Sequence, residues 1–260
     1  MIIDTVPMTS CDRWYQGAGT VEFRVANNQI NGNAGTFSGG RLNCRVPYAL
    51  NHKVNNKDQR LNFTGGTIDL CGNDQAMGVL GCRGGTITSA TPALMHLVDD
   101  YNNTEGEFGK SQRTNACVFA GCAGLSKEGS YDHTLVKAST TTGTLAVAKG
   151  TLTMFKDATR TGSWLNSTNV VVTGGKLVLM HNMAFGRKVV FSVGGSGKAD
   201  LAFVGTQDVK ELYLNGVSVE AGKTYGGSAS DADIKNDTYF TSTGTGKIRV
   251  HGVGLVLYIR

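Results

Sequence analysis

The residues of this chain that could bind a ligand or perform chemistry fall into two polar segments that contain aromatic side chains. The first is RTGSWLNSTN, in which Trp164 lies between Arg160 and Asn166. An indole ring exposed in a polar turn can stack on the apolar C–H face of a sugar, and the flanking side chains can bond hydroxyls or glucuronic acid carboxylates. The alternative is that Trp164 only anchors the turn. The segment therefore predicts either a polysaccharide-binding site or a structural turn.

The second segment is HLVDDYNNTEGEFGKSQR, which contains Asp99, Asp100 and Tyr101, and we add Tyr131 from a later polar loop to this candidate site. Calcium prefers carboxylate, amide and carbonyl oxygens, so Asp99, Asp100 and Asn102 are weak candidates for a calcium site. A calcium-dependent polysaccharide lyase would need such a site. The alternative is a solvated loop inserted between repeating units.

Other catalytic patterns are missing from the sequence. It contains no GxSxG elbow, HExxH pair or phosphate-binding loop, and its five histidines are dispersed. In GGSGKAD the lysine is not followed by Ser or Thr, so we expect a corner before a strand. The carboxylates of Asp231, Asp233 and Asp237 are expected to be structural. The sequence predicts a protein without catalytic residues or a cofactor, with calcium as the one possible exception.

The composition limits the classes of protein to which the chain can belong. It has 36 glycines but only 3 prolines among 260 residues, and its charge of +5 is scattered without a run of Lys or Arg. We therefore expect neither a collagen-like chain nor a nucleic-acid-binding protein. No apolar run reaches the ~18 residues of a transmembrane helix, so no membrane span is expected.

The six cysteines include no CxxC pair. They are expected to be structural disulfides or buried thiols, and disulfides would imply an extracytoplasmic location. Cys44 and Cys71 occupy similar positions after a Gly-Gly pair, offset by one residue. They could therefore be neighbours if the chain repeats.

The chain does repeat, loosely, in Gly-Gly or Gly-Thr pairs that precede short alternating strands such as TIDLC, TLAVA, TLTMF and KLVLM. The intervals between marker glycines are 26 residues from Gly40 to Gly66, then 19 to Gly85, and 25 from Gly150 to Gly175. Such short strands predict a parallel β-helix, because each coil must share its apolar side with the next. An antiparallel sandwich is the alternative. Residues 91–101 could form a short helix or a strand followed by a loop.

Three segments resemble the autotransporter-associated β-strand repeat of secreted bacterial β-helix proteins: residues 61–98, 125–154 and 209–250. In the first, the matching positions are Gly65, Gly66, Asp69, Leu70, Gly72, Asn73, Gln75, Leu80, Gly85 and Ile87. The resemblance implies an all-β, right-handed parallel β-helix with irregular coils of about 19–26 residues and loop insertions. It implies one domain over residues 1–260, with a cap and first coils (1–59), repeat coils (60–205) and a terminal element (206–260).

Some β-helix proteins of this kind are xylan-binding carbohydrate-binding modules attached to glycoside hydrolases of gut bacteria. The resemblance therefore implies a secreted, monomeric, non-catalytic module that binds xylan along a shallow groove. Two other functions remain open. One is a pectate-lyase-like lyase or hydrolase, and the other is a structural adhesin or passenger fragment.

Overall fold

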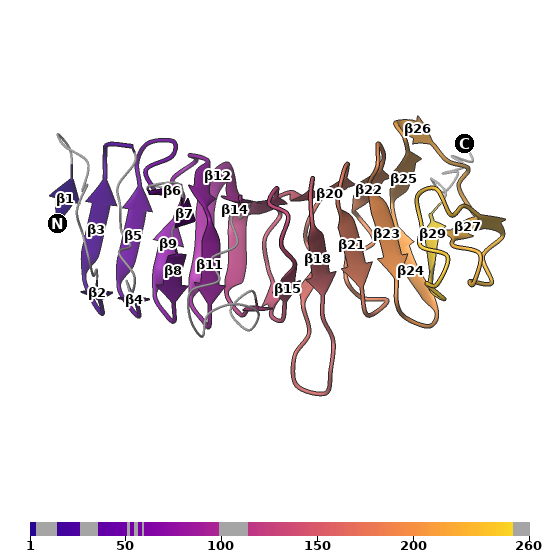
Figure 1. The fold of residues 1–260 in the computed structure, drawn as a ribbon, viewed down its shortest axis with the longest axis horizontal. Helices are drawn as coiled ribbons and strands as arrows, with labels where there is room; N and C mark the ends of the chain where they lie inside the picture. Colours follow the sequence, from indigo (N-terminus) through magenta and orange to yellow (C-terminus); the bar gives the residue numbers. More distant parts are fainter. Residues whose placement is uncertain are drawn as a thin grey trace, which may run out of the picture.

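The computed structural model describes residues 1–3, 15–26, 36–50, 53–54, 57–58, 60–98 and 114–251. Within these ranges the regular structure consists entirely of β-strands and isolated bridges. The strands lie side by side along the long axis of the molecule, and the N- and C-terminal parts of the chain lie at opposite ends (Figure 1). The expected all-β class is confirmed.

The largest sheet in the described part of the chain has 12 strands and runs the length of the molecule. In spatial order its main path is β1 (Ile2–Ile3), β3 (Thr20–Phe23), β5 (Arg41–Cys44), β9 (Thr67–Asp69), β12 (Thr86–Leu97), β14 (Val118–Lys127), β17 (Leu145–Val147), β20 (Asn169–Val172), β22 (Val190–Val193), β25 (Glu211–Leu214) and β26 (Val217–Ser218). The twelfth strand, β10 (Gln75–Met77), pairs with the second half of β12.

Smaller sheets complete the described structure. One contains β11 (Val79–Cys82), β8 (Arg60–Phe63), β4 (Thr36–Phe37) and β2 (Tyr15–Gln16). A second contains β13 (Thr114–Asn115), β15 (His133–Leu135), β18 (Thr151–Met154), β21 (Lys176–Leu179) and β23 (Lys198–Leu201). A third contains β24 (Thr206–Val209), β29 (Lys247–Val250), β27 (Thr224–Gly226) and β28 (Ile234–Lys235). Two pairs remain: β16 (Ala138–Ser139) with β19 (Ser163–Trp164), and β6 (Lys53–Val54) with β7 (Lys57–Asp58).

Most strand pairs are parallel, which an antiparallel sandwich would not produce. Along the large sheet Val21 pairs with Leu42, Leu42 with Ile68, and Ile68 with Ile87, so each strand meets the equivalent part of the next repeat. The antiparallel pairs are β25–β26, β27–β29 and β6–β7 among the described strands. The Leu-Asn-Gly segment at residues 214–216 forms the turn that joins β25 to β26, with Asn215 at φ 51° and Gly216 at φ 80°.

The marker glycines form stacked corners. Gly40 and Gly66 both have positive φ, which costs glycine little. A Cβ atom on Gly66 would lie 2.8 Å from the carbonyl carbon of Gly39 and 2.8 Å from the carbonyl oxygen of Gly40. Glycine is therefore needed here both for the backbone conformation and for the close approach of neighbouring corners.

Buried hydrophobic side chains from these sheets form one core cluster. Its aromatic members include Phe37 and Phe63, whose rings stack with centroids 5.3 Å apart. Phe23, Phe63, Phe191, Phe203 and Phe240, which lie in strands or next to them, are also buried. Phe155 is half-buried, and the guanidinium of Arg160 lies 4.9 Å from its ring centroid.

The segment 91–101, for which a helix and a strand were both open, begins as strand. Its residues up to Leu97 belong to β12, which pairs with β14 through a register shift between Ser89 and Ala93. Cys44 and Cys71 are both free thiols, and the pairing of Asn43 with Asp69 places them one residue out of register, as the sequence offset predicted.

Candidate functional site

The structure corrects the interpretation of Trp164 as a surface platform for a sugar. Its side chain is 0% exposed, and its ring packs against Phe119 with centroids 5.2 Å apart. A fully buried ring cannot stack on a ligand at the surface. The alternative, a residue that anchors the turn, agrees with this position.

The two polar residues that flank Trp164 are exposed but lie in separate turns. The carboxylate of Asp157 accepts hydrogen bonds from the Arg160 guanidinium, and the shorter is 2.7 Å. These bonds hold the pKa of Asp157 well below its usual range. The Asn166 amide donates to the carbonyl of Thr140 at 3.3 Å. With Trp164 buried, these residues have no exposed aromatic ring between them.

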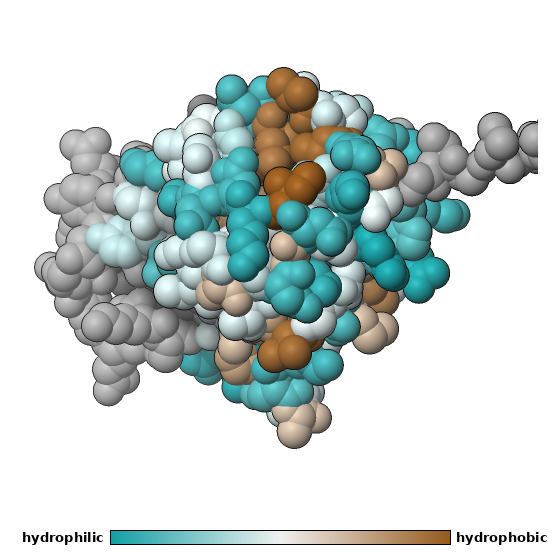
Figure 2. Space-filling model, turned by 90° about the vertical axis from the view of Figure 1, so that its right-hand side faces the viewer, coloured by the Kyte–Doolittle hydropathy of each residue, from teal (hydrophilic) through white to brown (hydrophobic). Residues whose placement is uncertain are grey.

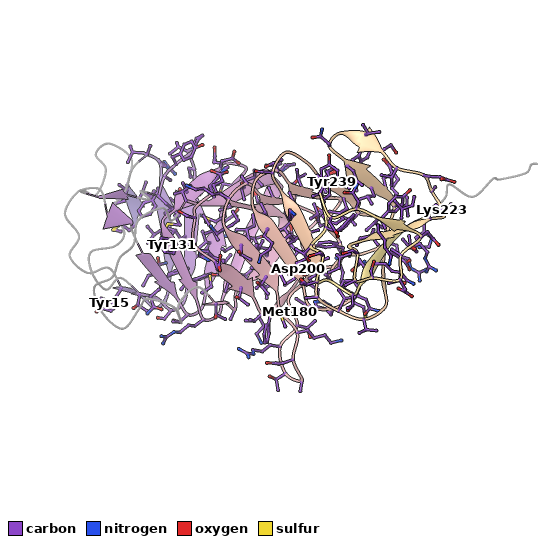
Figure 3. The ribbon with its side chains drawn as sticks, turned by 45° about the vertical axis from the view of Figure 1, so that its right-hand side comes forward. Tyr15, Tyr131, Met180, Asp200, Lys223 and Tyr239 are labelled. Carbon is purple, nitrogen blue, oxygen red and sulfur yellow. The ribbon has the colours of Figure 1, made fainter. Side chains whose placement is uncertain are left out.

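Tyr131 is half-buried in the turn that precedes β15 and has contacts of its own. In Figure 3 it lies between Tyr15, near one end of the molecule, and Lys223, near the other. The remaining candidates, Asp99, Asp100, Tyr101 and Asn102, lie outside the described residues. The calcium prediction that rests on them stays a prediction. Elsewhere in the described ranges, no group of three His, Cys, Asp or Glu side chains is arranged to hold a metal ion.

The aspartates of the terminal element bond within it, as expected. The carboxylate of Asp233 accepts from the Thr224 amide at 2.8 Å, and that of Asp237 accepts from the Ser228 amide at 2.8 Å. Asp231 pairs with Lys247 at 2.8 Å. All three carboxylates therefore bond to groups within the terminal element.

A row of outward-facing side chains runs along the large sheet. By period-two alternation the middle residue of each strand from β12 to β25 faces away from the core, and it is half-buried in all of these strands except β14, where Ser126 is buried with 5% of its surface exposed. Direct cross-strand pairing places these outward residues in one line, in the order His96, Ser126, Ala146, Val171, Ser192 and Tyr213. We call this line the outward row.

The Tyr213 end of the outward row contains an open pocket of about 430 Å³. It is lined by small or apolar residues and one aromatic ring, namely Val171, Val172, Thr173, Val190, Ser192, Val193, Gly194, Tyr213 and Gly216. The β25–β26 turn contributes Gly216 to its wall. The next residue, Val217, is 68% exposed, and hydrophobic residues gather in the upper part of this end of the molecule (Figure 2).

A hydrogen bond holds the hydroxyl group of Tyr213 in a fixed position. Its hydroxyl donates to the carboxylate of Glu211 at 2.9 Å, and Lys210 pairs with the same carboxylate at 2.7 Å. Lys210 first, and then Tyr213, lower the pKa of Glu211, while Glu211 raises the pKa of Tyr213. Glu211 is therefore ionised and Tyr213 protonated at neutral pH. These bonds hold the half-buried Tyr213 ring in place at the pocket.

The opposite end of the outward row carries a second polar and aromatic group. The imidazole Nδ1 of His96 lies 2.6 Å from a carboxylate oxygen of Glu128, and Nε2 lies 3.7 Å from Asp74. The ring of Tyr48 lies 6.5 Å from the imidazole, centroid to centroid, and Tyr48 is 48% exposed. Ser126 donates to Glu128 at 2.7 Å. We call Tyr48, His96, Asp74 and Glu128 the His96 cluster.

Sequence reasoning missed both ends of this row. Tyr213 lies in the strand ELYL, where alternation between Leu212 and Leu214 already predicts that the tyrosine points outward. The predicted binding rings all lay in polar turns, whereas Tyr213 lies in a strand. The His96 cluster had no local signal, since its members come from four separate places in the chain.

Comparisons with protein-family models, curated proteins and solved structures yield no significant match to this chain. No helix in the described ranges is long and apolar enough to cross a lipid bilayer. Functional inference therefore rests on the geometry of the outward row.

Proposed function

We propose that this chain is a non-catalytic carbohydrate-binding module that binds an extended plant cell-wall polysaccharide, xylan by resemblance, along the outward row. The observation that carries the proposal is the open pocket in which Tyr213 lies beside Val171 and Ser192. An aromatic ring among small residues offers the flat, partly apolar contact that a sugar ring prefers.

The architecture in this proposal is a right-handed parallel β-helix. Parallel pairing of each strand with the next repeat supports a coil, as in the pairing of Val170 with Phe191 and of Phe191 with Leu212. Stacked coils form long faces along which a polymer can lie. Secretion, a monomeric state and attachment to glycoside hydrolase domains belong to the same proposal, and they rest on the resemblance alone.

Binding would be modest in affinity, because a shallow site covers only part of a ligand. The Val171 and Ser192 side chains would contact ring faces. The Glu211 carboxylate and the Asn215 amide near the turn would bond hydroxyls.

Affinity electrophoresis and isothermal titration against soluble xylan and a panel of other plant polysaccharides test the proposal. We expect Tyr213→Ala to weaken binding about twofold to tenfold, the value of one aromatic stacking contact. Tyr213→Phe keeps the ring and should bind nearly as well as the wild type. Tyr15→Ala removes an exposed ring at the other end and should change nothing. A wild-type protein that binds none of the polysaccharides contradicts the proposal.

The same panel distinguishes the two alternatives. A lyase would release unsaturated ends from pectate or alginate, so absorbance is followed with and without calcium. A structural passenger would neither bind nor cleave any glycan. Cleavage would replace the proposal with the enzyme, and complete inertness would favour the passenger.

A further inference from the structure

The outward row has a different character in its middle and at its ends. The row residues of β17, β20 and β22 and their same-face neighbours are all uncharged, namely Thr144, Ala146, Ala148, Asn169, Val171, Thr173, Val190, Ser192 and Gly194. Charged groups and aromatic rings occur together only where the row ends, at Tyr213 with Glu211 and at the His96 cluster.

The length of the row follows from the pairing register. His96 and Tyr213 are separated by five strand-to-strand steps. At about 4.8 Å per step the two residues lie about 24 Å apart. Taking about one such step for each sugar ring of an extended β-linked chain, about six rings would cover the row.

The His96 cluster is suited to hydroxyl-rich ligands. Tyr48 offers an exposed ring beside the His96 imidazole, whose side chain is 16% exposed, and the side chains of Asp74 and Glu128 are 46% and 38% exposed. Exposed carboxylates accept hydrogen bonds from sugar hydroxyls. The backbone of Tyr48 has φ 51°, and its amide donates to the Asp74 carbonyl at 2.8 Å, which holds the residue beside the cluster.

The uncharged middle of the outward row favours a neutral polymer over one that carries a uronate on each sugar. A uronate carboxylate on each sugar would be partly desolvated there without a cationic partner, which costs free energy. The exposed carboxylates of Asp74 and Glu128 at one end would repel it further, whereas Glu211 at the other end is paired with Lys210. A neutral backbone meets neither penalty.

We propose that the His96 cluster and Tyr213 are the two anchors of one binding track, and this proposal rests on the proposed function. The track binds a single neutral, extended β-linked glycan chain of about six sugars. Chains too short to reach both anchors bind only the pocket at Tyr213. The two anchors then act together on a long chain, as linked sites do.

Isothermal titration with neutral β-1,4-linked xylo-oligosaccharides, from the disaccharide to the octasaccharide, tests the track. Affinity should rise steeply up to about the hexasaccharide and then level off. Tyr213→Ala should weaken both the disaccharide and the hexasaccharide. Tyr48→Asn, which removes the ring but tolerates the positive φ, should weaken the hexasaccharide about fivefold to tenfold and leave the disaccharide unchanged.

Tyr48→Phe is the control for folding, and His96→Gln is a second test of this anchor. Tyr48→Phe keeps the ring, and His96→Gln keeps a hydrogen-bonding group beside Glu128. Tyr48→Phe should bind like the wild type. His96→Gln should weaken only the longer chains.

Three results overturn the track and leave the proposed function standing. These are an affinity that stops rising at the disaccharide, a Tyr48→Asn variant that binds the hexasaccharide normally while Tyr213→Ala does not, and an oligogalacturonate that binds as tightly as a xylo-oligosaccharide of equal length. Failure of every glycan, polymer and oligomer alike, removes both.

Discussion

Trp164 packs on Phe119 inside the molecule, with ring centroids 5.2 Å apart and an interplanar angle of 41°. Trp164 lies in β19 and Phe119 in β14, and both strands contact β16. The Ser139 hydroxyl accepts a hydrogen bond from the Phe119 amide at 3.0 Å, and Ser139 pairs with Trp164. The pair shows that a tryptophan in a polar segment of sequence can be a core residue of the stacked sheets.

Trp164→Ala should therefore reduce stability and not ligand binding. We expect a loss of about 3–5 kcal/mol in the free energy of unfolding, because a large buried ring is replaced by a cavity. Trp164→Phe should cost only about 1–2 kcal/mol, since it refills most of the space and removes an indole N–H that is buried without a hydrogen-bond partner. Urea unfolding measures both. A Trp164→Ala protein of normal stability would contradict the buried position.

Gly66→Ala should destabilise the protein through both backbone strain and a clash. Gly66 has φ 83°, and its Cβ would lie 2.8 Å from backbone atoms of the preceding corner. Gly222 has a similar φ of 82° but nothing within 4 Å, so Gly222→Ala isolates the backbone cost. We expect about 1 kcal/mol for Gly222→Ala and more than about 2 kcal/mol for Gly66→Ala. Equal losses in thermal unfolding would show that the corners are not closely stacked.

Acid should weaken the charged network on β3 and β5. Hydrogen bonds from Arg45, then Arg24 and Asn43, lower the pKa of Glu22 from 4.5 to about 2. The unfolded chain binds more protons than the folded one between these values. The contribution of Glu22 to stability is thus complete above about pH 4.5 and is lost as the pH falls toward 2.

Thermal unfolding measured at several pH values from neutral down to about 2 tests this loss of stability. Glu22→Gln should be less stable than the wild type at neutral pH, and the difference should shrink as the pH falls toward 2. A difference that is the same at both pH values would contradict the lowered pKa.

Alkylation of thiols should separate the described cysteines into two groups. Cys44, Cys82 and Cys117 are buried, and burial raises the pKa of both Cys44 and Cys82. Cys71 and Cys122 are only half-buried. Because the thiolate is the reactive form, iodoacetamide should label Cys122 and, more slowly, Cys71, whose pKa is also raised by burial and by Asp69.

Peptide mapping by mass spectrometry reads the labels. Protein unfolded in guanidinium under reducing conditions is the control, in which all five described cysteines should react. Labelling of native Cys82 or Cys117 as fast as Cys122 would show that the core opens more readily than its burial implies.

The sequence by itself determined the local elements. Alternation in TLTM and KLVL predicted β18 and β21, and glycine pairs such as those ending at Gly40 and Gly66 marked the repeats before their strands. These features depend on residues close together in the chain, since period-two burial and positive φ are local properties. The same alternation points Tyr213 outward.

Only the tertiary structure decided which polar and aromatic residues share a surface. Trp164 is buried because Phe119, from an earlier repeat, lies against it. Tyr213 borders an open pocket because the neighbouring strands place Val171 and Ser192 beside it, and His96 meets Glu128 only through the pairing of β12 with β14. The register between repeats sets these contacts, and irregular repeat lengths leave that register undetermined until the strands pair.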